Sequence, residues 1–181
     1  LTLSGTDTSR VLLITGDIEV AILDVAISGG NSDSGGGIYN TGALRLTNSI
    51  VSGNTASGYG GGIYNNAGTL TLTDSAISSN SADLGGGIFN ETGTVTLTES
   101  ALSGNTAGSG GGIYNSFGTL TITDSTVNGN TGDNGGGIYN NGAGDLTNST
   151  ISGNTATVAG GGIYNNYDSL TITDSTVNGN Y

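Results

Sequence analysis

The sequence predicts an all-β solenoid of about seven coils, with one repeat of about 25 residues in each coil. The motif GGGIYN, which reads GGGIFN once, occurs six times, and its first glycine recurs every 25 residues from Gly35 to Gly160. Stretches such as TLTLT alternate with a period of two residues, which is typical of strands. The chain has 181 residues with 36 glycines, no proline and 33% hydrophobic residues, which is too few apolar side chains for an ordinary compact core.

The repeats divide the chain into a lead-in and one continuous array. Residues 1–31 form a degenerate N-terminal part, in which VAILDVAISGGN aligns with LTLTDSAISSN after one extra glycine. Residues 32–181 hold six repeats, each with GGG, an Ile-aromatic-Asn triplet, an alternating stretch, a polar-Ser pair and a closing asparagine. The repeats that begin at Gly35 and Gly135 are one residue short before the pair and one residue long after the closing asparagine. The coil length is therefore conserved.

Each repeat is too small to fold alone. Glycine clusters and Asn-Ser-Gly bends divide it into two or three short strands. Its four inward aliphatic residues, for example Ile63, Leu70, Leu72 and Ile77, contribute about 6 to 12 kcal/mol on burial. Ordering 25 backbone units costs about 25 to 50 kcal/mol, so the repeats must stack, with like strands about 4.8 Å apart.

Stacking places equivalent residues in columns. Ile38 and its five counterparts form an aliphatic column inside the solenoid. An aromatic column lies beside it, and we expect it to face outward; if it faced inward, it would be part of the core. Two asparagine ladders follow, one from the triplets, beginning at Asn40, and one from the closing asparagines. The aromatic column is Tyr39, Tyr64, Phe89, Tyr114, Tyr139 and Tyr164, and the closing ladder is Asn54, Asn80, Asn105, Asn130, Asn154 and Asn180.

The paired motifs resemble those of a known family. GGGIYN, together with VSGN at 51–54 and ISSN at 77–80, is similar to the GGA[ILV] and FxxN repeats of polymorphic outer-membrane proteins and related bacterial surface proteins. Glycine stands here for the alanine of that motif, and aliphatic residues stand for its phenylalanine. The resemblance implies a right-handed parallel β-helix, an extracellular or cell-surface passenger region, and a role in adhesion or surface architecture.

Composition excludes several functions. The net charge of −12, with only two basic residues, disfavours nucleic acid and anionic membranes, and no apolar run is long enough for membrane insertion. Without His, Cys or Lys, the usual nucleophile-base pairs cannot form, so we expect no enzyme, no cofactor and no metal site. The carboxylates of Asp74, Glu99 and Asp124 occupy equivalent places about 4.8 Å apart. They are interpreted as solvated corner residues, with a bound cation or an acid-base pair of a carbohydrate-active β-helix as alternatives.

Threonines form the candidate binding face. Thr-x-Thr rows on a flat solenoid side resemble the ice-binding surfaces of antifreeze proteins, although threonine is also a favourable outward strand residue. Arg45 and Asp145 interrupt the rows, which argues against an ice-matching plane. The structural or adhesive hypothesis is therefore preferred, with ice binding as an alternative. The face consists of Thr69, Thr71, Thr73, Thr94, Thr96, Thr98, Thr119, Thr121, Thr123, Thr171 and Thr173.

The expected partners are another copy, stacked head to tail, or host and matrix surface ligands. The chain ends at Asn180-Tyr181 in phase with the repeat, so it is interpreted either as part of a longer passenger or as a fibre subunit. Glycans are an option on Ser and Thr, and the N-glycosylation pattern occurs at Asn90-Glu91-Thr92 and Asn148-Ser149-Thr150.

Overall fold

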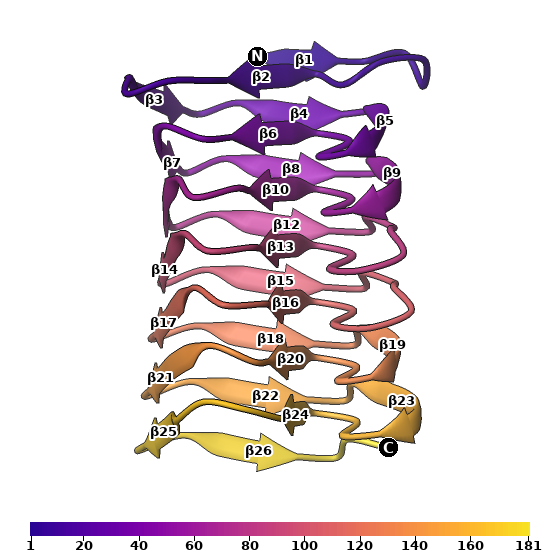
Figure 1. Ribbon diagram of the computed structural model, residues 1–181, viewed down its shortest axis with the longest axis vertical. Coiled ribbons are helices and arrows are strands. Elements are labelled where there is room, and N and C mark those ends of the chain that lie inside the picture. Colours follow the sequence, from indigo (N-terminus) through magenta and orange to yellow (C-terminus); the bar gives the residue numbers. More distant parts are fainter.

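The computed structural model describes residues 1–181 and confirms an all-β solenoid of about seven coils (Figure 1). All strand pairs within its three long sheets are parallel, and each strand pairs with its counterpart in the next coil. Sheet A contains β1 (Thr2–Ser4), β4 (Ala26–Ser28), β8 (Ile50–Ser52), β12 (Ala76–Ser78), β15 (Ala101–Ser103), β18 (Thr126–Asn128), β22 (Thr150–Ser152) and β26 (Thr176–Asn178).

Sheets B and C complete the three-sided frame. Sheet B contains β2 (Leu12–Ile14), β6 (Ile38–Asn40), β10 (Ile63–Asn65), β13 (Ile88–Asn90), β16 (Ile113–Asn115), β20 (Ile138–Asn140) and β24 (Ile163–Asn165). Sheet C contains β3 (Glu19–Leu23), β7 (Ala43–Thr47), β11 (Thr69–Thr73), β14 (Thr94–Thr98), β17 (Thr119–Thr123), β21 (Ala143–Thr147) and β25 (Leu170–Thr173). Residues 1–31 supply β1 to β4 and continue the same three sheets.

The interior is a stack of aliphatic side chains. Ile63, Leu70, Leu72 and Ile77 are each completely buried, as expected from the alternation. They belong to one cluster of 21 buried aliphatic residues that runs through the solenoid. Because each coil is covered by its neighbours, the burial that one repeat cannot achieve is shared along the array.

A fourth wall, which the sequence does not predict, lies between sheets A and B. It consists of two short strand pairs, β5 (Asn31–Ser34) with β9 (Thr55–Tyr59), and β19 (Thr131–Asn134) with β23 (Thr155–Ala159). Isolated bridges through Ser81 and Thr106 connect the two pairs. The register shifts within both pairs, so the extra residue that follows Asn54 or Asn154 is absorbed here as a bulge.

The glycine triplet allows the fourth wall to approach the next coil. Gly110, the first of its triplet, has a φ of 63°, which favours glycine. The second glycine, Gly111, is needed for space. A Cβ atom on Gly111 would lie 2.5 Å from the carbonyl oxygen of Gly136 and closer still to that of Thr131.

A polar residue turns the chain from sheet C into sheet A in every coil. This corner residue has a left-handed backbone, with φ between 47° and 57°, at Asp24, Asn48, Asp74, Glu99, Asp124, Asn148 and Asp174. Asp and Asn tolerate this conformation because their short side chains bond locally. Glu99 is the only glutamate among them, and the others are Asp or Asn. The left-handed backbone therefore explains which residue types occupy the corner.

Replacing Glu99 with asparagine should therefore stabilise the solenoid by about 0.5 to 1 kcal/mol. The new amide can also donate to Asp74, as Asn48 donates to Asp24 at 2.5 Å. Urea denaturation checks this. The same substitution at Glu19, an exposed strand residue, is the control and should produce no gain; equal changes in the two variants would contradict the corner explanation.

Candidate binding face and aromatic column

Nine threonines of sheet C form a three-by-three array, here called the threonine array. Strands β11, β14 and β17 are in register, so Thr71 lies beside Thr96, and Thr96 beside Thr121; the rows on either side align in the same way. The alternate residues of these strands are buried. The array is Thr69, Thr71, Thr73, Thr94, Thr96, Thr98, Thr119, Thr121 and Thr123.

Charged residues bound the array on both sides. Arg45 of β7 pairs in register with Thr71, and Asp145 of β21 pairs with Thr121. Both charged residues are exposed. The structure therefore brings nine of the eleven candidate threonines together and leaves Thr171 and Thr173 on β25, beyond the coil of Asp145.

The aromatic column faces outward on sheet B. Each aromatic residue lies between an isoleucine and an asparagine that point into the solenoid. Ring centroids of neighbouring coils are 4.4 to 5.5 Å apart, from Tyr39 to Tyr164. Tyr114 and Tyr139 are the closest pair, with planes 9° from parallel. The rings from Phe89 to Tyr164 are stacked face to face, whereas Tyr64 meets both Tyr39 and Phe89 edge to face.

Two residues outside the repeat motif cover the column. The Tyr59 ring lies 4.9 Å from that of Phe89 and 6.0 Å from that of Tyr64, and these two rings are only 6% and 8% exposed. At the N-terminal end, the Arg10 guanidinium carbon lies 4.9 Å from the Tyr39 ring centroid. Arg10 also donates to the carbonyl of Gly35 at 3.1 Å. Neither residue has a counterpart in every repeat, so periodicity could not identify it.

The phenol groups make specific contacts between coils. The Tyr64 hydroxyl donates to the carboxylate of Glu91, and the Asn66 amide donates to the Tyr39 hydroxyl at 2.9 Å. Burial, followed by the contact with Glu91, raises the pKa of Tyr64 well above its ordinary value. Burial, followed by the neighbouring Tyr139, raises the pKa of Tyr114 to about 12.

Stability should consequently fall in strong alkali. The unfolded chain releases a tyrosine proton near pH 10, whereas folded Tyr64 and Tyr114 retain theirs at that pH. The stability from these neutral phenols is complete below pH 10 and is lost as the pH rises toward about 12. Urea midpoints measured across this range should decline, and less steeply in a Tyr64→Phe, Tyr114→Phe double variant. Tyr167→Phe, at an exposed position, is the control, and an unchanged slope in the double variant would contradict the assignment.

Both asparagine ladders lie inside the solenoid and hold the coils together. The triplet ladder begins with the Asn40 amide, which donates to Asn65 at 2.8 Å. In the closing ladder, Asn105 donates to Asn130 at 2.9 Å and accepts from Asn80 at 3.0 Å. Their burial makes them structural elements and leaves the outer surface to the threonines and the aromatic column.

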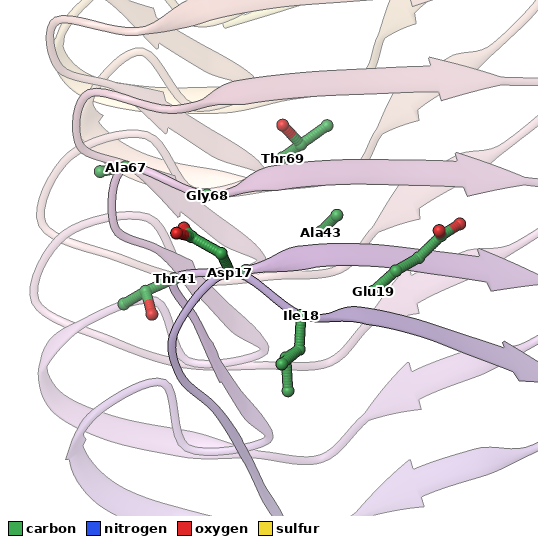
Figure 2. A pocket seen from close by; sticks show the side chains of 9 residues that line it. Asp17, Ile18, Glu19, Thr41, Ala43, Ala67, Gly68 and Thr69 are labelled. Atoms are coloured by element: carbon green, nitrogen blue, oxygen red, sulfur yellow. The ribbon is translucent and has the colours of Figure 1, made fainter.

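The acidic residues form no cluster that could hold a metal ion. Asp74, Glu99 and Asp124 are exposed corner residues, and no group of three or more His, Cys, Asp or Glu residues lies close enough to hold a metal ion. A hollow of about 370 Å³ is lined by Asp17, Ile18 and Glu19 and by residues of the next two coils. The two carboxylates point away from each other there (Figure 2). No helix suited to crossing a membrane is present.

The two N-glycosylation patterns differ in accessibility. Asn90 is fully buried, and its amide donates to Asn115 at 2.8 Å. Asn148 is an exposed corner residue whose amide donates to Asp124. Of the two patterns, only the one at Asn148 presents its asparagine to solvent in the folded chain.

Fold and surface together define a parallel β-solenoid repeat protein. Three of its segments match the Chlamydia polymorphic membrane protein repeat, at residues 48–66, 99–116 and 148–166. Each match starts at a corner residue, passes through a strand of sheet A and a closing asparagine, and ends at the residue that follows the triplet of sheet B. No curated protein and no solved structure matches the chain. The repeat matches support a surface-associated β-helical protein.

Proposed function

We propose that this chain is a non-enzymatic, extracellular structural or adhesive β-solenoid, forming coils of a surface-protein passenger or of a fibre subunit. The observation that carries the proposal is the threonine array, a regular polar face held on rigid strands whose other side is the buried core. The three repeat matches support placing such a face at a cell surface.

The chemistry of the array favours neutral, polar ligands. A threonine hydroxyl both donates and accepts hydrogen bonds, and its methyl group provides an apolar contact. The net charge of −12 repels anionic surfaces. Host or matrix glycans without acidic groups are therefore the proposed ligand class for adhesion.

Adhesion can be tested with beads that carry the purified chain. Binding to cultured epithelial cells and to immobilised neutral glycans would be compared between the parent chain and Thr96→Glu, which places a charge at the centre of the array. Thr106→Glu, at an exposed position of the fourth wall, is the matched control. We expect only Thr96→Glu to reduce binding at least tenfold; equal binding by all three proteins would refute adhesion through this face.

The fibre hypothesis concerns the C-terminal coil. Ile172 and Val177, whose counterparts in earlier coils are buried, are 45% and 47% exposed there. Another coil, from a longer chain or from a second copy, would cover them. Electron microscopy of the purified chain should reveal filaments one solenoid wide if copies stack end to end, whereas separate short rods would reject the fibre and leave the passenger role.

Ice binding is the second candidate function, and the in-register threonine array is the observation that favours it. If it is correct, the chain should shape ice crystals and cause thermal hysteresis, and Thr96→Glu should abolish both while Thr106→Glu does not. Normal ice growth in the presence of the parent chain would eliminate this candidate.

A further inference from the structure

The outward face of sheet C is arranged symmetrically about β14. In the order of the sheet, β7 lies two strands before β14 and β21 lies two strands after it. Arg45 is at the centre of β7, and Asp145 is at the centre of β21, in the same column as Thr96. The two opposite charges therefore lie at equal distances, about 9.6 Å, on either side of Thr96.

The neighbours of the two charges are matched as well. Ala43 and Thr47 flank Arg45, and Ala143 and Thr147 flank Asp145 in the same columns. A twofold rotation about an axis along β14 therefore exchanges the position of Ala43 with that of Ala143, and the position of Thr47 with that of Thr147. It also places each charge where the opposite charge was.

We propose that two copies of this chain pair face to face through sheet C, with antiparallel solenoid axes and a twofold axis along β14. In this arrangement Arg45 of each copy faces Asp145 of the other, so the interface contains two equivalent ion pairs. Thr96 faces Thr96 of the second copy, and the threonine arrays cover each other, so pairing and ligand binding through the array compete for the same face.

The chemistry of the face suits its own copy. Arginine can bind a carboxylate with two parallel hydrogen bonds. Facing threonines can donate and accept in either direction, and Ala43 against Ala143 permits close approach. The parallel alternative, with the twofold axis along the solenoid, would place Arg45 against Arg45 and Asp145 against Asp145. Like charges therefore disfavour the parallel pair and select the antiparallel one.

The dimensions of the face predict a weak dimer. Seven strands of four or five residues cover about 16 by 34 Å, so a dimer would bury about 1,000 Å² in total, near the lower limit for a specific interface. The charge of −12 on each copy opposes association, and Glu19 faces the uncharged Ser169 of the second copy without a cation. We expect association at micromolar or higher concentration. This contact uses the side of the solenoid and is independent of end-to-end stacking.

Charge exchange tests the pairing by sedimentation velocity of the whole chain over a concentration series. Arg45→Asp or Asp145→Arg alone should weaken self-association at least tenfold, because each places like charges opposite each other. An equimolar mixture of the two variants should form a heterodimer, and the double exchange Arg45→Asp, Asp145→Arg should regain the parent affinity. Asp83→Arg, an exposed site on the fourth wall, carries the same charge change as Asp145→Arg and should not reproduce its loss.

Cross-linking tests the antiparallel geometry. The chain has no cysteine, so a single introduced thiol reports one position. Thr96→Cys should be joined to its own copy by a short bismaleimide. Thr171→Cys should not, because three strands on each side of the axis separate the two thiols by about 29 Å. Cross-linking of Thr171→Cys, a monomer at all concentrations, or a dimer insensitive to both charge changes would overturn the proposal.

Discussion

Replacing Gly111 with alanine is expected to destabilise the solenoid by about 3 kcal/mol or more, an effect in the upper range for single substitutions. The added methyl group would lie 2.5 Å from the carbonyl oxygen of Gly136 and nearer to that of Thr131. Both are backbone atoms of the next coil, so relief requires the coils to separate and weakens the strand pairing around them. Urea denaturation followed by circular dichroism measures the loss.

The control for Gly111 is Gly129→Ala. Gly129 has a φ of 61°, and a Cβ atom there would meet no atom within 4 Å. Its substitution should cost only the left-handed backbone penalty, about 1 to 2 kcal/mol. If the two variants lose the same stability, the close approach of the coils is not what requires glycine at position 111.

Asn105→Leu is expected to cost about 4 kcal/mol or more, because it removes a hydrogen bond from each of four buried polar groups, at about 1 to 1.5 kcal/mol each. The Asn105 side-chain oxygen accepts from the backbone nitrogen and the amide of Asn80, both at 3.0 Å. Its amide donates to the Ile77 carbonyl at 3.0 Å and to Asn130 at 2.9 Å. Leucine has a similar volume but satisfies none of these four groups.

Thermal and urea unfolding of Asn105→Leu should be compared with Asn128→Leu. Asn128 is exposed on β18, so the same substitution there should change the free energy of unfolding by less than about 0.5 kcal/mol. A small effect at both positions would mean that the closing ladder adds little beyond the strand pairing, contrary to its complete burial in the middle coils.

Much of the fold follows from local sequence. The period of 25 residues sets the coil, and the alternation in TLTLT separates the buried Leu70 and Leu72 from the outward threonines. The same alternation in the Ile-aromatic-Asn triplet decides that the ring faces outward, although three residues are too short a stretch for the sequence alone to exclude the opposite orientation. The sequence does not predict the fourth wall, because its segments have no apolar alternation. The residue type at equivalent positions differs between coils, as at Ser32 and Ala82, and the segments pair mainly through the backbone.

One part of the candidate site could be predicted from the sequence and another part could not. The threonine array follows from equal spacing, which any fold that stacks the repeats must place in register. The cover of Tyr59 over Phe89, the contact of Tyr64 with Glu91 and the position of Arg10 over Tyr39 could not be inferred, because each occurs in one coil only. The repeat period of the sequence indicates the contacts that every coil shares, and it gives no information about a contact that occurs only once.

The sequence by itself therefore determined the solenoid, its coil length, its aliphatic interior and its asparagine ladders, because identical side chains at a constant spacing must stack upon one another. Only the tertiary structure decided which way the aromatic column faces and how a bulge absorbs the extra residue. These properties depend on which side of each strand is covered and on the register between coils, which are fixed when the coils pack.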